Sequence, residues 1–110
     1  MNNIAELKEN IIGIISLRDE LIQLKKYDRY TYSLYEYIEL FREKLIFTDH
    51  GGNDIFWYPK HVALTKLDQL SDIDEESFNS RFSANKTKLL SIMNRYIKDL
   101  QHGFHLYDSG

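Results

Sequence analysis

Apolar residues recur along this chain at intervals of three and four, and this spacing limits the fold more than any other feature. Near the N-terminus, Ile4, Leu7, Ile11 and Ile14 follow one stripe of a helix with 3.6 residues per turn. Strand-like alternation is missing from the sequence, apart from the short DIFWY segment. The spacing therefore predicts an all-α fold, with a first helix from about residue 3 to 26.

Capping residues and helix breakers set the bounds of two further helices. The second spans about residues 28 to 47, with Asp28 as its N-cap and the pair Gly51 and Gly52 as its stop. The third runs from Pro59 to about residue 70, because proline is accepted in a first turn, where its missing N–H costs nothing.

The last third of the chain reads as a fourth helix, from about residue 74 to 101. Asp72 or Asp74 caps its start, Gly103 lies just beyond its end, and Ser83 is a possible second N-cap that would divide it. The tail, residues 103–110, has no apolar period, so we expect it to be frayed. Since short connections make successive helices antiparallel neighbours, we predict one domain, residues 1–110, folded as an antiparallel bundle of about four helices.

The second helix has two different faces. At 100° per residue, one face is apolar and is assigned to the core: Tyr30, Leu34, Tyr37, Ile38, Phe41 and Leu45. The opposite face is expected to be exposed and acidic, with Tyr35 at its edge: Tyr32, Glu36, Glu39 and Glu43.

Composition narrows the classes of partner. The net charge is −3, from 17 acidic and 14 basic residues, and the bases are scattered along the sequence, which disfavours nucleic-acid binding. There is no cysteine, no signal-peptide pattern and no apolar run long enough to span a membrane. We therefore expect a cytoplasmic protein without a membrane or nucleic-acid partner.

Five acids within nine residues form an acidic run without a base. This run is either a solvated loop and helix start or a patch that faces a basic partner. Its members are Asp68, Asp72, Asp74, Glu75 and Glu76.

No residue pattern requires a metal or a cofactor. The four histidines are interpreted as surface residues. His102 and His105 are three positions apart, a spacing that can ligate a metal from one helix face, but the sequence fixes no third ligand. Gly51 and Gly52 lack the pattern of a phosphate-binding loop, and no serine lies in a nucleophile-elbow motif. We expect no metal, no cofactor and no catalytic residues.

One enzymatic alternative stays open. Arg95 and His102, near the end of the last predicted helix, fit the loose Arg-x4-6-His signature of HEPN ribonucleases, an all-helical family of similar size. By that resemblance His102 would act as the acid/base group and Arg95 would hold the scissile phosphate. The other interpretation is a surface arginine and a C-terminal histidine that is favourable to the helix dipole.

The stretch HGGNDIFWYP, residues 50–59, places large aromatic side chains directly after a turn. Trp57 and Tyr58 either pack into the core from a short helix or form an exposed platform. Tyrosine and tryptophan are enriched at binding hot spots, and an acidic helix face beside such a platform would suit a basic protein partner.

This stretch resembles the DNase-type immunity proteins of colicins and pyocins. Those are small, acidic, four-helix proteins in which a carboxylate-bearing second helix ends in His-Pro and is followed by a glycine and an Asp-Leu-Ile-Tyr-Tyr-Pro segment. His50, Gly52 and the segment from Asp54 to Pro59 occur here in the same order, with Gly51 in place of the family's proline. The resemblance implies that Asp54, Trp57 and Tyr58 supply shared binding energy, and that second-helix carboxylates select the partner.

The sequence thus predicts a non-enzymatic inhibitor that binds and neutralises a cognate bacterial toxin by occlusion, with a basic nuclease as a candidate toxin. Two alternatives remain: the HEPN-like ribonuclease, and a generic helical adaptor or phage-encoded regulator, for which Trp57 would be fully buried. The predicted partner-binding residues are Tyr32, Glu36, Glu39, Glu43, Asp54, Trp57 and Tyr58.

Overall fold

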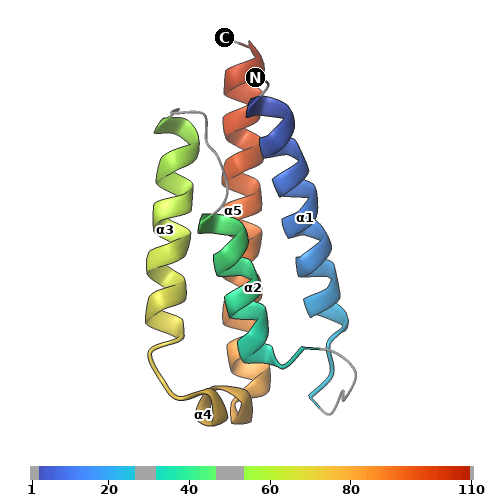
Figure 1. Cartoon of the computed structure of the whole chain (residues 1–110), viewed down its shortest axis with the longest axis vertical. Helices are drawn as coiled ribbons and strands as arrows, with labels where there is room; N and C mark the ends of the chain where they lie inside the picture. The colour runs from blue at the N-terminus through green and yellow to red at the C-terminus, as the bar shows by residue number, and fades with distance from the viewer. Residues whose placement is uncertain (1–2, 27–31, 47–53, 110) are drawn as a thin grey trace.

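The computed structural model describes residues 3–26, 32–46 and 54–109, with side chains described for 5, 8–26, 32–46 and 57–103. The long helices alternate in direction, so that the predicted all-α antiparallel bundle is confirmed (Figure 1). The described residues form five helices: α1 Asn3–Gln23, α2 Leu34–Ile46, α3 Asp54–Leu70, α4 Glu75–Ser80 and α5 Phe82–Ser109.

The core lies along α5, which packs against α1 and α3, while α2 covers the remaining side (Figure 1). The aromatic rings of Phe41 and Tyr96 meet edge to face at 5.9 Å between α2 and α5. The apolar face predicted for the second helix is confirmed over its described residues, since each of these side chains is buried: Leu34, Tyr37, Ile38, Phe41 and Leu45.

Helix α2 begins at Leu34, six residues after the predicted N-cap Asp28, which lies outside the described residues. The hydroxyl of Ser33 accepts a hydrogen bond from the backbone N–H of Glu36 at 3.3 Å. This is one of the two hydrogen bonds of a Ser-x-x-Glu capping box. The side-chain oxygen of Asn79 in α4 accepts from the N–H of Tyr35 at 3.0 Å. Two N–H groups without intrahelical partners are thereby satisfied, and both bonds fix where the helix starts.

Helix α3 begins at Asp54, five residues earlier than the predicted start at Pro59. Pro59 is buried inside the helix. An internal proline removes one intrahelical hydrogen bond and disfavours helical geometry for the residue before it, and here the segment is helical in spite of this cost. The prediction that Pro59 opens the helix was wrong, and Trp57 and Tyr58 are therefore helical residues.

The predicted fourth helix is divided in two. Asp74 caps α4 by accepting a hydrogen bond from the N–H of Ser77 at 2.9 Å, and the chain leaves helical geometry at Arg81, with φ −94° and ψ 49°. The buried amide of Asn85 then donates to the carbonyl of Phe78 at 2.9 Å, which satisfies a carbonyl at the end of α4. A division was predicted at Ser83, and it occurs two residues earlier.

Helix α5 continues to Ser109, so the predicted end near residue 101 was wrong, and the tail that was expected to be frayed extends the helix. Gly103 does not stop the helix, because it continues a stripe of buried positions at intervals of three and four that includes Met93, Tyr96 and Leu100. An internal glycine costs about 1 kcal/mol relative to alanine, which packing along such a stripe offsets.

Candidate functional site

The acidic face predicted for α2 is exposed. Glu36, Glu39 and Glu43 all point to solvent, on the side of the helix opposite the buried apolar stripe. Tyr35 is half-buried at the edge of this face, and its ring meets that of Phe78 edge to face at 5.6 Å. The prediction for these three glutamates is therefore correct as to exposure.

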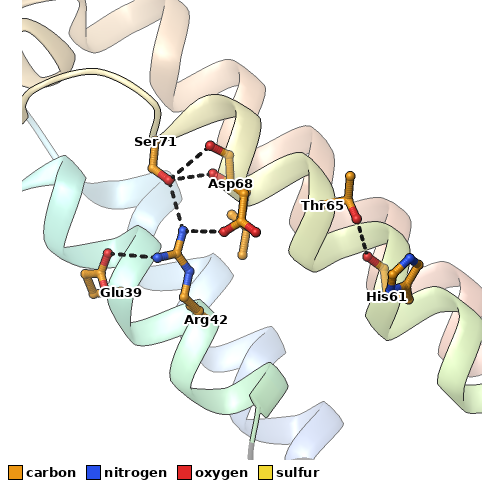
Figure 2. Close-up of polar contacts among 7 residues, drawn as sticks. Glu39, Arg42, His61, Thr65, Asp68 and Ser71 are labelled. Atoms are coloured by element: carbon orange, nitrogen blue, oxygen red, sulfur yellow. Dashed lines mark hydrogen bonds and ion pairs between the residues drawn. The ribbon is translucent and has the colours of Figure 1, made fainter.

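Arg42 lies on the side of α2 that faces α3, and it modifies the charge of this region (Figure 2). Its guanidinium donates to the Oγ of Ser71 at 2.9 Å and forms ion pairs with Asp68 at 3.1 Å and Glu39 at 3.5 Å. Glu39 is thus partly neutralised. Within the described part of the chain, Glu36 and Glu43 form no ion pair, so they carry most of the free negative charge of the face.

Trp57 and Tyr58 are exposed rather than core residues. The side chain of Trp57 is 47% exposed and that of Tyr58 is 65% exposed. Adjacent helical residues diverge by about 100°, so the two rings do not form one flat platform. Trp57 instead stacks on the imidazole of His61, one turn along α3, with ring centroids 5.1 Å apart and planes inclined by 7°.

The Trp57–His61 pair lies beside the C-terminal end of α2. Lys60, between these two residues in the sequence, donates from its ammonium group to the carbonyl of Ile46, the last residue of α2, at 3.3 Å. The side chain of Ile46 is exposed. Ile46 and His61 were not predicted as site residues, although His61 could have been found from its position four residues after Trp57, where helical side chains meet.

Tyr32 does not join this group. It precedes α2, whose 13 residues extend about 20 Å. It therefore lies near the opposite end of α2 from Ile46, with its half-exposed ring against that of Tyr37 at 5.9 Å. Asp54 is the first residue of α3, one turn before Trp57, and its side chain lies outside the described residues.

The structure therefore divides the predicted binding residues. We define the Trp57 surface as the region where the C-terminal end of α2 meets the first turns of α3, and its residues are Ile46, Trp57 and His61. Glu39 and Glu43 lie seven and three residues before Ile46 on α2, and Glu39 is nearer the end of α3, because its partner Arg42 also binds Asp68 and Ser71. Tyr58 points away from the Trp57 surface and Tyr32 is remote from it.

Arg95 and His102, the pair that fits the HEPN signature, are both exposed on α5. His102 is seven positions after Arg95, so the two residues share one face and lie about 10.5 Å apart along the axis. The Nε of Arg95 donates to both carboxylate oxygens of Asp99, at 3.0 and 3.1 Å. A phosphate would have to compete with this carboxylate for the guanidinium, which is unfavourable for the proposed catalytic role.

The structure offers little for metal or membrane chemistry. Among the residues it describes, no three histidines or carboxylates are grouped closely enough to hold a metal ion. His50 and the side chain of His105 lie outside the described residues. None of the described helices combines the length and the apolar composition of a membrane span.

The Trp57 surface offers an aromatic ring supported by an imidazole and an exposed aliphatic side chain. Comparison with known proteins finds no matching family model, no matching curated protein and no matching solved structure.

Proposed function

We propose that this protein is an immunity-type inhibitor that acts in the cytoplasm, where it binds a basic toxin protein and neutralises it by occlusion. The observation that carries the proposal is the half-exposed Trp57, the chain's only tryptophan, stacked on His61 beside the C-terminal end of α2, a helix that exposes three glutamates. The resemblance of residues 50–59 to colicin and pyocin immunity proteins supports the same function.

The Trp57 surface has the properties of a binding hot spot. A tryptophan in a monomer exposes a large apolar area, and its burial against a partner stabilises a complex more than most other contacts do. Stacking on His61 holds the indole in one orientation, which lowers the entropy that is lost on binding. Exposed Ile46 adds apolar area beside it.

The exposed glutamates of α2 give the proposed interface a charge preference. Carboxylates on the same molecule attract a basic partner and increase the association rate, and they disfavour acidic partners. Glu36 and Glu43 contribute most, since Glu39 is paired with Arg42. In the proposed mechanism the indole anchors the toxin, the glutamates orient it, and the bulk of the bundle blocks its substrate site without any turnover.

The two alternatives have less support. A generic adaptor without a functional Trp57 was expected to bury this side chain, which is half-exposed. The HEPN-like ribonuclease needs a guanidinium that is free to bind phosphate, and Arg95 is held by two hydrogen bonds to Asp99.

The proposal is tested by capture and neutralisation. The tagged protein is used to recover partners at high salt from its source cells, and each recovered protein is then expressed alone and together with the wild-type chain. We expect one basic partner that is toxic alone and harmless in co-expression. Trp57→Ala should weaken the purified complex by about 2 kcal/mol, or roughly 30-fold in Kd, and should abolish protection.

Ile12→Ala is the matched control, because Ile12 is an exposed apolar residue of α1, outside the Trp57 surface. It should leave both Kd and protection unchanged. A partner that is not toxic, or a loss of affinity below about twofold for Trp57→Ala, would contradict the proposal.

A further inference from the structure

A second, oppositely charged surface lies between α3 and α5. The C-terminal half of α3, the N-terminal half of α5 and the connection that carries Ile73 enclose an open groove of about 890 Å³. We call it the basic groove, because the described residues that line it include no acid and these four cations: Lys66, Arg81, Lys88 and Arg95.

These cations are far apart in the sequence, and the fold brings them together in a chain whose net charge is −3. Arg95 is paired with Asp99. In the part of the chain that the structure describes, no carboxylate lies within ion-pair distance of Lys66, Arg81 or Lys88. Asp72 flanks Ile73 in the sequence but does not line the groove. Three positive charges are thus available to a negatively charged ligand.

The cations are spread along the length of the groove. Lys88 and Arg95 are seven residues apart in α5, which is almost two full turns and a rise of about 10.5 Å, and Arg81 lies just before that helix. On the opposite wall, Lys66 and Leu70 are one turn apart in α3, and Ile73 follows in the connection after it. The positive charge therefore suits an elongated acidic ligand more than a compact one.

Three aliphatic side chains line the groove among these cations. Leu70 and Ile92 are half-buried, and the side chain of Ile73 is 42% exposed. The other lining residues are polar and uncharged: Gln69, Asn85, Thr87 and Ser91. Aliphatic side chains beside cations match an amphipathic helix that has aliphatic side chains on one face and carboxylates beside them. Helix-in-groove recognition of this kind is a recurring mode of peptide binding.

Other ligands fit less well. None of the described side chains that line the groove is aromatic, whereas sites for single-stranded nucleic acids stack bases on aromatic rings. A phosphate would leave the aliphatic side chains of Leu70, Ile73 and Ile92 uncovered.

We propose that the basic groove binds an acidic amphipathic helix of another protein, with its aliphatic face on Leu70, Ile73 and Ile92 and its carboxylates on Lys66, Arg81 and Lys88. This groove is separate from the Trp57 surface. Lys66 points about 200° around α3 from Asp68, which pairs with Arg42 of α2. The protein thus has two binding surfaces of opposite charge preference.

The probe is a fluorescent synthetic amphipathic helix of three heptads, with leucine at two positions in each heptad and glutamate beside them. Its binding to the full-length protein is measured by fluorescence anisotropy, and its location by amide chemical shifts. We expect saturable binding, with shift changes concentrated in residues 66–73 and 81–95. The double variant Lys66→Glu/Lys88→Glu should raise Kd about tenfold or more.

Lys98→Glu is the matched control, since Lys98 is an exposed base of α5 that does not line the groove. It should leave the peptide Kd unchanged, as should Trp57→Ala, so that failure of the toxin-binding proposal is distinguishable from failure of this one. Two control peptides are used, one with lysine in place of glutamate and one with serine in place of leucine. Neither should bind.

Any of four results in the binding experiments would overturn the proposal. They are no binding of the acidic helix at millimolar concentration, equal binding by the double variant, equal binding of a control peptide, or tighter binding of a single-stranded oligonucleotide at the same residues. Self-association of the protein through the groove, seen by sedimentation and lost in the double variant, would also overturn it.

Discussion

At the scale of single residues, Asp74 couples folding to pH. Its carboxylate accepts a hydrogen bond from the backbone N–H of Ser77, and this bond lowers the pKa of Asp74 below its ordinary value. Because the pKa is lowered in the folded state, the contribution of this cap to the free energy of unfolding is fully present at pH values above the unfolded pKa, about 3.9. The contribution is lost as pH falls through the folded value, which lies lower still.

We therefore expect Asp74→Ala to lower the urea midpoint of unfolding at neutral pH. The difference in urea midpoint between the variant and the wild type, called the gap below, should disappear as the pH falls below about 4. Circular dichroism during urea titration at several pH values measures this gap. Asp72→Ala is the control, because it removes a carboxylate from the same connection without removing the cap. A gap that persists unchanged at the lowest pH would show that the ionised carboxylate is not responsible.

At the scale of helices, Arg42 joins α2 to α3 through Ser71 and Asp68. Arg42→Ala should lower the free energy of unfolding by about 1–2 kcal/mol, since a partly buried, charge-assisted hydrogen bond is lost. Asp68→Ala should cost less than about 1 kcal/mol, because the side chain of Asp68 is 71% exposed and surface ion pairs contribute little. Urea denaturation of both variants measures this asymmetry, and equal losses would contradict it.

Gly13 offers a stabilising change within α1. At an internal helical position, alanine is more stable than glycine by about 0.5–1 kcal/mol. A Cβ at this position would meet the Nζ of Lys44 in α2 at 3.4 Å, and the end of a lysine side chain moves easily. Gly13→Ala should therefore raise the free energy of unfolding by about that amount with an unchanged denaturant slope. A loss of stability would mean that the methyl group forces α1 and α2 apart.

At the scale of the whole molecule, the bundle measures 46 × 25 × 20 Å, and its two proposed binding surfaces use different sides of α3. Because they do not overlap, a saturating amount of the acidic helix should leave the Kd of the toxin complex within about twofold of its value without the peptide. Anisotropy of a ternary mixture and a competition titration measure this independence. Mutual exclusion would show that the two ligands share one surface.

Much of the fold was predictable from the sequence because helical periodicity is local. The buried face of α2 and the exposure of Glu36, Glu39 and Glu43 follow from the 3.6-residue period. Helix ends were less predictable, since they depend on bonds between distant residues, such as that from Tyr35 to Asn79. The start of α3 was missed because a proline was taken as a helix start, whereas the helix accommodates it in its interior.

The sequence by itself determined the helical class, the acidic character of one helix face and the aromatic content of residues 54–58, because each depends on neighbouring residues. Only the tertiary structure decided that Trp57 is half-exposed against His61, that Arg42 neutralises part of the acidic face, and that Lys66 and Lys88 share one groove. Exposure and charge proximity depend on which helix faces meet, and the packing of α2 and α5 against α3 sets those faces.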